Sequence, residues 1–337
     1  MDFIYEYGMF LAKLMTVVVF LLVSFAGINL IFSRGRSRRR EEHLEIRHLN
    51  RKFEDMALSL KSAILPQREF KHALKRLKDQ HKQDEKTGGV SRAGQARKKR
   101  VFVLKFKGDI LASAVAELRE EITAVLLVAA PEDEVVVLLE SAGGIVHSYG
   151  LAASQLLRIR QKNVTLTVAV DRMAASGGYM MACVADRIIA APFAIVGSIG
   201  VVAQLPNFNR LLKNHDIDYE LITAGEYKRT LTMFGEITEK GRAKFREEIE
   251  DLYALFKGFI RDNRSQVDID RIATGEYWHG VRALELKLVD ELRTSDDYLQ
   301  AASETADLYE VSYRRRRSPL ERLTSPFASI QSKAWRN

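Results

Sequence analysis

Residues 171–183 read DRMAASGGYMMAC, and this stretch decides the fold. It follows an apolar run at residues 164–170 that predicts a buried strand, and it leads into small residues that predict a helix. Ser176 therefore lies between a strand and a helix, where free backbone N–H groups point outward and the helix dipole favours negative charge. A serine in this place is either a simple helix cap or an oxygen that becomes anionic during catalysis.

Strands and helices alternate on both sides of this stretch. Apolar runs predict further strands at residues 101–106, 135–139, 187–191 and 219–223. Apolar residues spaced three or four apart predict helices at residues 113–130, 149–159 and 238–264. This order indicates an α/β fold with a mainly parallel sheet covered by helices. Ligands bind at the carboxyl ends of such strands, which is where Gly143, Ser176 and Lys228 fall.

A serine hydroxyl becomes a good nucleophile only when a base removes its proton. Four of the seven histidines precede residue 101, and of the other three His147 lies nearest to the predicted site. Lys228 is the alternative base, because apolar residues follow it closely and could exclude water. A lysine accepts a proton only when burial lowers its pKa far below the ordinary value of about 10.4. Cys183, the single cysteine, lies in an apolar segment and is predicted to be a core residue.

The first 33 residues are predicted to be a transmembrane anchor. Residues 9–32 are almost continuously apolar and long enough to cross a bilayer as a helix. A cleaved signal peptide is the alternative, but no basic residue precedes Lys13 and the apolar run continues past a possible cleavage site at residues 24–26. Arginines occupy positions 34, 36, 38, 39 and 40, whereas acidic residues precede the span. The positive-inside rule therefore favours the cytoplasmic face for the rest of the chain.

Charged segments flank the predicted folded domain at residues 101–312. Residues 34–100 predict a basic stalk of two amphipathic helices interrupted near Pro66, with a flexible linker after them. These helices either form a solvated stalk or lie on a membrane or a neighbouring subunit. Residues 313–337 form a basic tail. The net charge of +8 is unevenly distributed, so it does not predict nucleic-acid binding, and one cysteine excludes an internal disulfide and a cysteine-based metal site.

Three spaced motifs resemble peptidase family S49, which contains the signal peptide peptidases of the SppA type. They are residues 174–179 (AASGGY), 196–201 (VGSIGV) and 224–228 (AGEYK). The likeness extends from the predicted anchor to about residue 292. It implies a ClpP/crotonase-like fold and a serine endopeptidase without cofactor or metal. In that enzyme Ser176 would be acylated and Lys228, which the short spacing places in the same chain, would be the general base.

The resemblance also implies supporting residues and partners. Ser198 would hydrogen-bond Lys228, and the N–H groups of Gly177 and of Gly143 or Gly144 would form the oxyanion hole. Where the family pattern is Ser-Pro-Gly-Gly, residues 141–144 read Ser-Ala-Gly-Gly, so the turn lacks the fixed φ of proline. The expected setting is a homo-oligomer in a bacterial inner membrane, held by lipid around the anchor and cutting peptides or membrane-associated polypeptides. Family analogy favours the periplasmic face, against the arginine cluster.

Three other functions remain open at this point. A crotonase-like acyl-CoA enzyme would share a glycine-built oxyanion hole but would need a catalytic carboxylate. A ClpP-like Ser–His–Asp peptidase would need a histidine after the nucleophile helix, and residues 192–214 contain none. A catalytically idle membrane scaffold would need only the anchor and the stalk.

Overall fold

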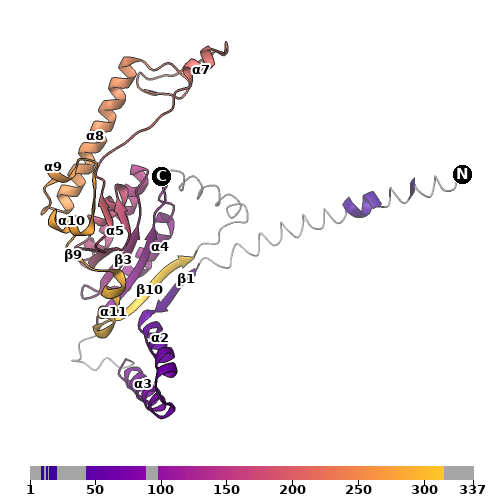
Figure 1. Ribbon diagram of the computed structural model, residues 1–337. Helices are drawn as coiled ribbons and strands as arrows, with labels where there is room; N and C mark the ends of the chain where they lie inside the picture. Colours follow the sequence, from indigo (N-terminus) through magenta and orange to yellow (C-terminus); the bar gives the residue numbers. More distant parts are fainter. Residues whose placement is uncertain (1–8, 11–12, 14, 21–42, 89–97, 315–337) are drawn as a thin grey trace.

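The computed structural model describes residues 9–10, 13, 15–20, 43–88 and 98–314. Figure 1 shows an α/β body from which two long elements project. One is a helical hairpin, α2 (Leu49–Ile64) and α3 (Gln67–Gly88), and the other is an arm that returns to the body through α8 (Glu239–Asn263). The predicted pair of stalk helices broken at Pro66 and the predicted long helix at residues 238–264 are confirmed.

A seven-stranded sheet forms the centre of the body, in the order β1-β10-β2-β3-β4-β6-β9. Its strands are β1 (His43–His48), β2 (Arg100–Lys107), β3 (Glu134–Glu140), β4 (Thr165–Val170), β6 (Arg187–Ala190), β9 (Glu291–Leu292) and β10 (Asp307–Arg314). Every neighbouring pair is parallel except β1 and β10. The predicted α/β fold with a mainly parallel sheet is therefore confirmed. Strand β1 lies in the segment predicted as stalk, and β10 continues past residue 312.

Both faces of this sheet are covered, because successive residues of a strand point to opposite sides. On one face Leu104, Val137 and Val168 belong to the core that contains α4 (Val115–Leu126) and α5 (Val146–Gln161). The other face carries Val103, Val136 and Ala169, which cluster with residues of α2 and of α11 (Ser295–Thr305). Burial of each large aliphatic side chain stabilises the fold by about 1.5–3 kcal/mol, so these layers hold the strand ends firmly in place.

A second sheet of three strands stands beyond the carboxyl ends of β3 and β4. It consists of β5 (Met173–Ala175), β7 (Ile195–Gly197) and β8 (Tyr277–His279), and β5 and β7 run parallel. A bridge between Ser141 and Ala174 ties β5 to the turn after β3. The short helix α6 (Gly177–Ala182) follows β5, as the sequence predicts.

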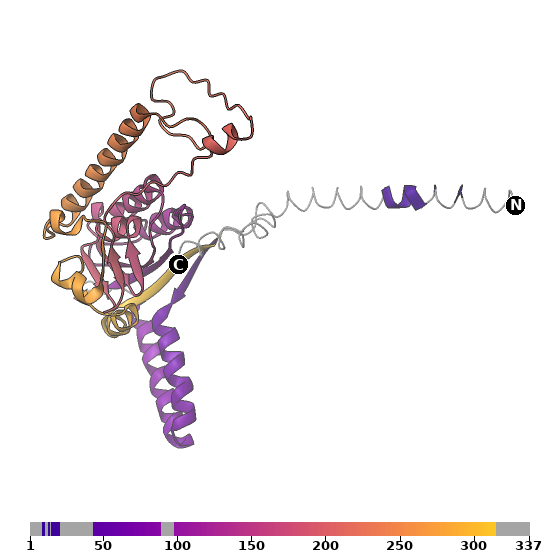
Figure 2. The ribbon, with the colours of Figure 1, turned by 45° about the horizontal axis from the view of Figure 1, so that its top comes forward.

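The arm spans residues 200–238 and the amino-terminal part of α8, and it reaches away from the sheet in both views of the ribbon (Figures 1 and 2). It contains one short helix, α7 (Asn209–Lys213). The strand predicted at residues 219–223 is wrong, because the arm brings no second strand beside this segment and its side chains are exposed, Ile222 by 86%. The carboxyl-terminal part of α8 returns to the core, where Phe256 and Ile260 are buried.

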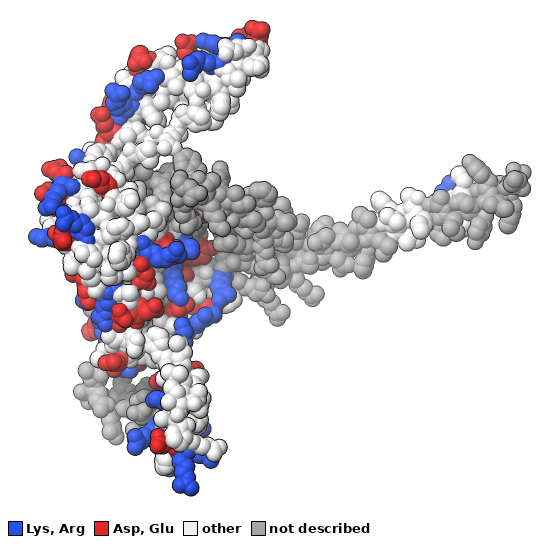
Figure 3. Space-filling model, viewed as in Figure 1, with Lys and Arg blue, Asp and Glu red and all other residues white. Residues whose placement is uncertain are grey.

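The hairpin is fastened to the body by Asn50. Its amide donates to the carbonyl oxygens of Ser303 (3.0 Å) and Ala306 (2.9 Å) and accepts from the N–H of Leu308 (2.8 Å). Away from this junction the hairpin contacts solvent, and Figure 3 shows lysine and arginine side chains around its tip. In the described ranges no helix combines the length and apolar content that a bilayer span needs. The anchor predicted at residues 9–32 lies largely outside them.

Candidate active site

Ser176 occupies the sharp turn between β5 and α6. Its backbone has φ 53° and ψ −119°, a region that costs a non-glycine residue about 1–3 kcal/mol. The turn is held because the Ser176 N–H donates to the carbonyl oxygen of Gly197 at 2.7 Å. The Ser176 side chain makes no capping hydrogen bond to α6. The simple cap that the sequence left open is therefore not what this serine forms.

Ser198 directly follows the neighbouring strand β7, and its backbone is strained like that of Ser176. Its φ is also 53°, and its N–H donates to the carbonyl oxygen of Glu276 at 2.7 Å. Strands β5 and β7 are parallel and pair Ala175 with Gly197, so the residue that follows each of them lies at the same end of the small sheet. The structure thus brings Ser198 beside the turn of Ser176.

The paired glycines after β3 pack directly on this turn. Gly143 has φ +88°, and a Cβ added to it would lie 2.7 Å from the Gly177 nitrogen and 2.8 Å from the Ser176 Cβ. Ser141 fixes the approach, because its N–H donates to Met173 O (2.8 Å) and its carbonyl accepts from Ala175 N–H (2.9 Å). Only glycine fits at position 143, and this close contact joins the turn to the candidate nucleophile.

The N–H groups around Ser176 differ in their availability. The N–H of Gly143 already donates to Ser141 Oγ at 3.0 Å. Gly177 is the first residue of α6, where an N–H has no partner within the helix. The N–H of Gly144 donates to no acceptor in the part of the chain that the structure describes. The candidate free donors are therefore Gly177, which adjoins Ser176, and Gly144, which follows the glycine packed on the Ser176 turn.

Lys228 lies apart from this cluster, on the arm. Its side chain is exposed, and its N–H donates to Gly225 O at 3.2 Å within a tight turn. An ion pair between Glu226 and Lys240 fastens that turn to the first turns of α8. From Lys240 the helix runs about 24 Å, at 1.5 Å per residue, before Phe256 enters the core. In the single chain, as described, no hydrogen bond joins Ser176 to Lys228.

Comparison with known proteins identifies the family. The model for the amino-terminal part of peptidase family S49 matches residues 2–156, and the model for peptidase family S49 matches residues 158–309. The chain belongs to peptidase family S49. It is thus a peptidase with peptide or protein substrates.

Individual relatives agree with this assignment. The probable protease SohB of Haemophilus influenzae is 48% identical over 327 residues, which are 95% of this chain and 92% of that protein. The probable protease SohB of Buchnera aphidicola subsp. Schlechtendalia chinensis is 46% identical over 308 residues, 89% of this chain and 99% of that protein. One solved structure, a mutant of the 1510-N membrane-bound stomatin-specific protease in complex with a substrate peptide, aligns at 14% identity with a TM-score of 0.45. It covers 69% of this chain and all of that one.

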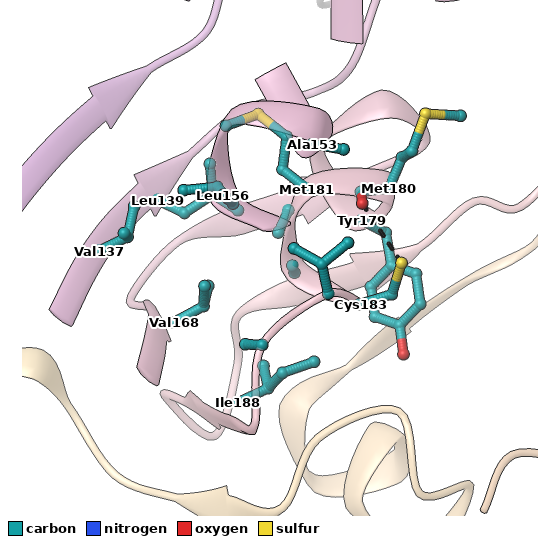
Figure 4. Packing of buried hydrophobic residues seen from close by; sticks show 14 of the residues in the cluster. Val137, Leu139, Ala153, Leu156, Val168, Tyr179, Met180, Met181, Cys183 and Ile188 are labelled. Carbon is teal, nitrogen blue, oxygen red and sulfur yellow. Dashed lines mark hydrogen bonds between the residues drawn. The ribbon is translucent and has the colours of Figure 1, made fainter. Parts of the chain in front are cut away.

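The helix that follows Ser176, α6, is buried in the core. Figure 4 shows Tyr179, Met181 and Cys183 among aliphatic side chains of the neighbouring strands and helices. Tyr179 Oη donates to Leu288 O at 2.9 Å, and Cys183 Sγ to Met180 O at 3.2 Å. Burial raises the pKa of the Cys183 thiol, so the group stays protonated and unreactive. The prediction that Cys183 is a core residue is confirmed.

The sequence analysis assigned no role to two residues of this candidate site, Ser141 and Tyr149. Ser141 belongs to the glycine turn and Tyr149 to the helix after it, and their hydroxyl oxygens are 2.6 Å apart. Tyr149 follows Gly144 by only five residues, but nothing in its spacing indicates that its ring would turn back toward Ser176. His147, the alternative base, is exposed on the first turn of α5.

Proposed function

We propose that this S49 peptidase is a membrane-anchored serine endopeptidase in which Ser176 is acylated and Lys228 is the general base. The observation that carries the proposal is the environment of Ser176. Its hydroxyl makes no capping bond to α6, its backbone is strained, and the Gly177 N–H at the start of α6 has no partner within the helix. The glycine turn packs on it so closely that a Cβ on Gly143 would lie 2.8 Å from Ser176 Cβ, and a strained serine in such a turn is typical of a nucleophile.

In the first step Ser176 Oγ attacks the carbonyl carbon of the scissile peptide bond while its proton moves to the neutral amine of Lys228. The negative charge then resides on the former carbonyl oxygen. We assign Gly177 N–H and Gly144 N–H as the donors that stabilise it, because Ser141 already occupies the N–H of Gly143. Removing one such donor typically raises the barrier by about 2.7–4 kcal/mol.

The tetrahedral intermediate collapses when Lys228 passes its proton to the leaving nitrogen, which breaks the peptide bond and leaves the acyl group on Ser176 Oγ. Water then attacks the ester, Lys228 takes the water proton, and the second collapse returns that proton to Ser176 as the acid product leaves. Ser198 lies beside the turn of Ser176, and its hydroxyl is assigned to orient the incoming amine.

This chemistry requires Lys228 Nζ to lie within hydrogen-bond distance of Ser176 Oγ, and the arm that contains Lys228 must bring it there. Either the arm folds over the site of its own chain, as the short sequence spacing predicts, or it completes the site of a neighbouring subunit. The arm exposes Val202 by 80%, Leu211 by 54% and Ile222 by 86%. Several large apolar side chains exposed on one projecting segment favour a role in binding another subunit, which supports a homo-oligomer.

The proposed location is the inner membrane of a bacterium, with residues 9–32 as the single span. The arginines at positions 34, 36, 38, 39 and 40 favour the cytoplasmic face for the peptidase domain by the positive-inside rule. A reporter fused after Asn337 tests this orientation, because it would be active on one side of the membrane only. Activity on the periplasmic side would reverse the assignment.

The test of the dyad compares full-length variants in a peptide-hydrolysis assay. Ser176→Ala and Lys228→Ala should each lower kcat/KM by at least about 1000-fold. Lys213→Ala, which removes an exposed lysine of the same arm outside the Lys228 turn, should stay close to the wild type. Wild-type turnover by Lys228→Ala would overturn the assignment of the base.

Coexpression of Ser176→Ala with Lys228→Ala tests whether the serine and the lysine of one site come from the same chain or from two subunits. A mixed oligomer regains activity if Lys228 of one subunit serves Ser176 of another, because some sites then contain both intact residues. It stays inactive if each site is built within one chain.

The separation of Lys228 from Ser176 in the single chain favours one competing function, an idle membrane scaffold. Such a scaffold would hydrolyse nothing, and Ser176→Ala would leave its behaviour unchanged. Membership of family S49 favours the peptidase over this scaffold and over the acyl-CoA enzyme.

A further inference from the structure

A chain of hydrogen bonds runs from the glycine turn into the core. Gly143 N–H donates to Ser141 Oγ at 3.0 Å, and Ser141 Oγ lies 2.6 Å from Tyr149 Oη. Tyr149 Oη in turn donates to the carbonyl oxygen of Asp109 at 2.7 Å. Each hydroxyl has one hydrogen, so Tyr149 gives its hydrogen to Asp109 and must accept that of Ser141. The direction of the whole chain is thereby fixed, and the turn has one preferred position.

This chain is sealed from water. Ser141 is 2% exposed and Tyr149 is fully buried. A Cβ added to Gly108 would lie 2.4 Å from Tyr149 Oη and 2.5 Å from Ser141 Oγ, so the backbone closes over the two hydroxyls. Burial raises the pKa of the Tyr149 phenol, which keeps its hydrogen in place at neutral pH. Buried hydrogen bonds in series strengthen one another and resist displacement.

The same tyrosine also supports the second oxyanion donor. A Cβ on Gly177 would lie 2.5 Å from Tyr149 Cγ and 2.8 Å from its Cδ2, so the ring packs against the Gly177 backbone. The hydroxyl therefore holds the turn of Gly143 and Gly144, while the ring holds Gly177. One side chain thus contacts both Ser141, which holds the glycine turn, and Gly177, which follows Ser176.

We propose that Tyr149 is a positioning residue that sets the two halves of the oxyanion hole through its ring and, via Ser141, its hydroxyl. The inference rests on the proposed function, because it assumes that Gly144 and Gly177 stabilise an oxyanion on the substrate. It also accounts for Ala142, which lacks the fixed φ of the proline expected at that place. The hydrogen-bond chain supplies the rigidity that the turn would otherwise take from a proline ring.

The experiment compares Tyr149→Phe with Tyr179→Phe in the full-length protein. Both variants remove one buried hydroxyl that donates to a backbone carbonyl, and both keep the aromatic ring. Tyr179 does not touch the glycine turn through its hydroxyl, so it controls for general loss of stability. The measurements are kcat and KM for a peptide substrate, the rate of acylation by a fluorophosphonate, and the melting temperature.

Tyr149→Phe should lower kcat about tenfold with KM unchanged, because an oxyanion contact acts in the transition state and not in substrate binding. Tyr179→Phe should leave kcat within about twofold of the wild type, even if its melting temperature falls as much as that of Tyr149→Phe. Ser141→Ala should match Tyr149→Phe, and the double variant should be no slower than the worse single one, because all three break one chain.

Equal kcat values for the two tyrosine variants would overturn the proposal, as would additive losses in the double variant. Failure of the proposed function gives a different result, since the wild-type protein itself would then show no acylation at Ser176.

Discussion

Replacing Gly143 by alanine tests the contact between the glycine turn and Ser176. Gly143 has φ +88°, where an L-residue pays about 1–2 kcal/mol in the backbone. The added methyl group would lie 2.7 Å from Gly177 N and 2.8 Å from both Ala175 O and Ser176 Cβ. All three neighbours belong to one strand-to-helix turn, so the two turns must move apart.

The separation displaces the Gly144 and Gly177 N–H groups from the position that the oxyanion occupies. Loss of one such donor lowers kcat by about 10²–10³-fold, so kcat/KM for Gly143→Ala should fall at least about 100-fold. The free energy of unfolding should fall by about 1–2 kcal/mol for the φ strain and by a further amount for the displaced contacts. Activity is therefore measured at a temperature where thermal unfolding shows the variant to be folded.

Gly150→Ala is the matched control in the same region. Gly150 lies within α5 and an added Cβ meets nothing within 4 Å, so the substitution should stabilise the helix by about 1 kcal/mol and preserve turnover. Peptide hydrolysis and thermal unfolding of both full-length variants give the comparison. A kcat/KM for Gly143→Ala within threefold of the wild type would refute the assignment of this turn to the oxyanion hole.

Three further substitutions test the framework around the site. Burial raises the pKa of Glu121 from 4.5 to about 7, so the folded state holds this proton more tightly and stability falls as pH rises from about 4.5 to about 7. Glu121→Gln should therefore add up to about 3 kcal/mol of stability at pH 8 and none at pH 4.5 in denaturant titrations; no gain at pH 8 contradicts this. Asp290→Ala leaves Arg264, which is 2% exposed, without its bidentate partner and should cost about 3 kcal/mol, whereas Glu285→Ala in an exposed pair should cost about 1 kcal/mol or less. Equal falls in the melting temperatures of Asp290→Ala and Glu285→Ala would contradict the larger cost expected for Asp290→Ala. Asn50→Ala removes three hydrogen bonds at the hairpin junction and should speed limited proteolysis there, while an unchanged cleavage rate would show that the junction does not depend on them.

The sequence predicted the parts of the fold that local patterns determine. The continuous apolar run at residues 164–170 becomes β4, and the spacing of apolar residues after residue 238 becomes α8. It also placed Gly143 and Ser176 at one edge, because parallel strands of a β–α–β unit end on the same side. Lys228, which the same argument placed there, lies on the arm instead, and Ser198 was named only through the resemblance to family S49.

Features that depend on distant partners were not predictable. Strand β1 has no buried residue, and four of its six residues are charged or histidine, so it resembled the stalk around it. Its partner β10 lies more than 250 residues away in sequence. Residues 219–223 have the composition of a strand but find no neighbour on the arm, which shows that composition alone does not make a strand.

The candidate site also contains residues whose place was predictable from local sequence and residues whose place was not. Ser176 was predictable because strand, serine and glycines are adjacent in sequence. The place of Lys228 was not, because it depends on the direction in which α8 leaves the body. The contact of Tyr149 with Gly177 arises only when α5 packs beside α6, and no local spacing encodes it.

Acylation of the full-length protein by a fluorophosphonate, with the modified residue located by mass spectrometry, tests the serine nucleophile most directly. The label should reside on Ser176 alone, disappear in Ser176→Ala and form far more slowly in Lys228→Ala. Labelling that persists undiminished in Ser176→Ala, or an active wild-type enzyme that never carries the label on this residue, would contradict the account.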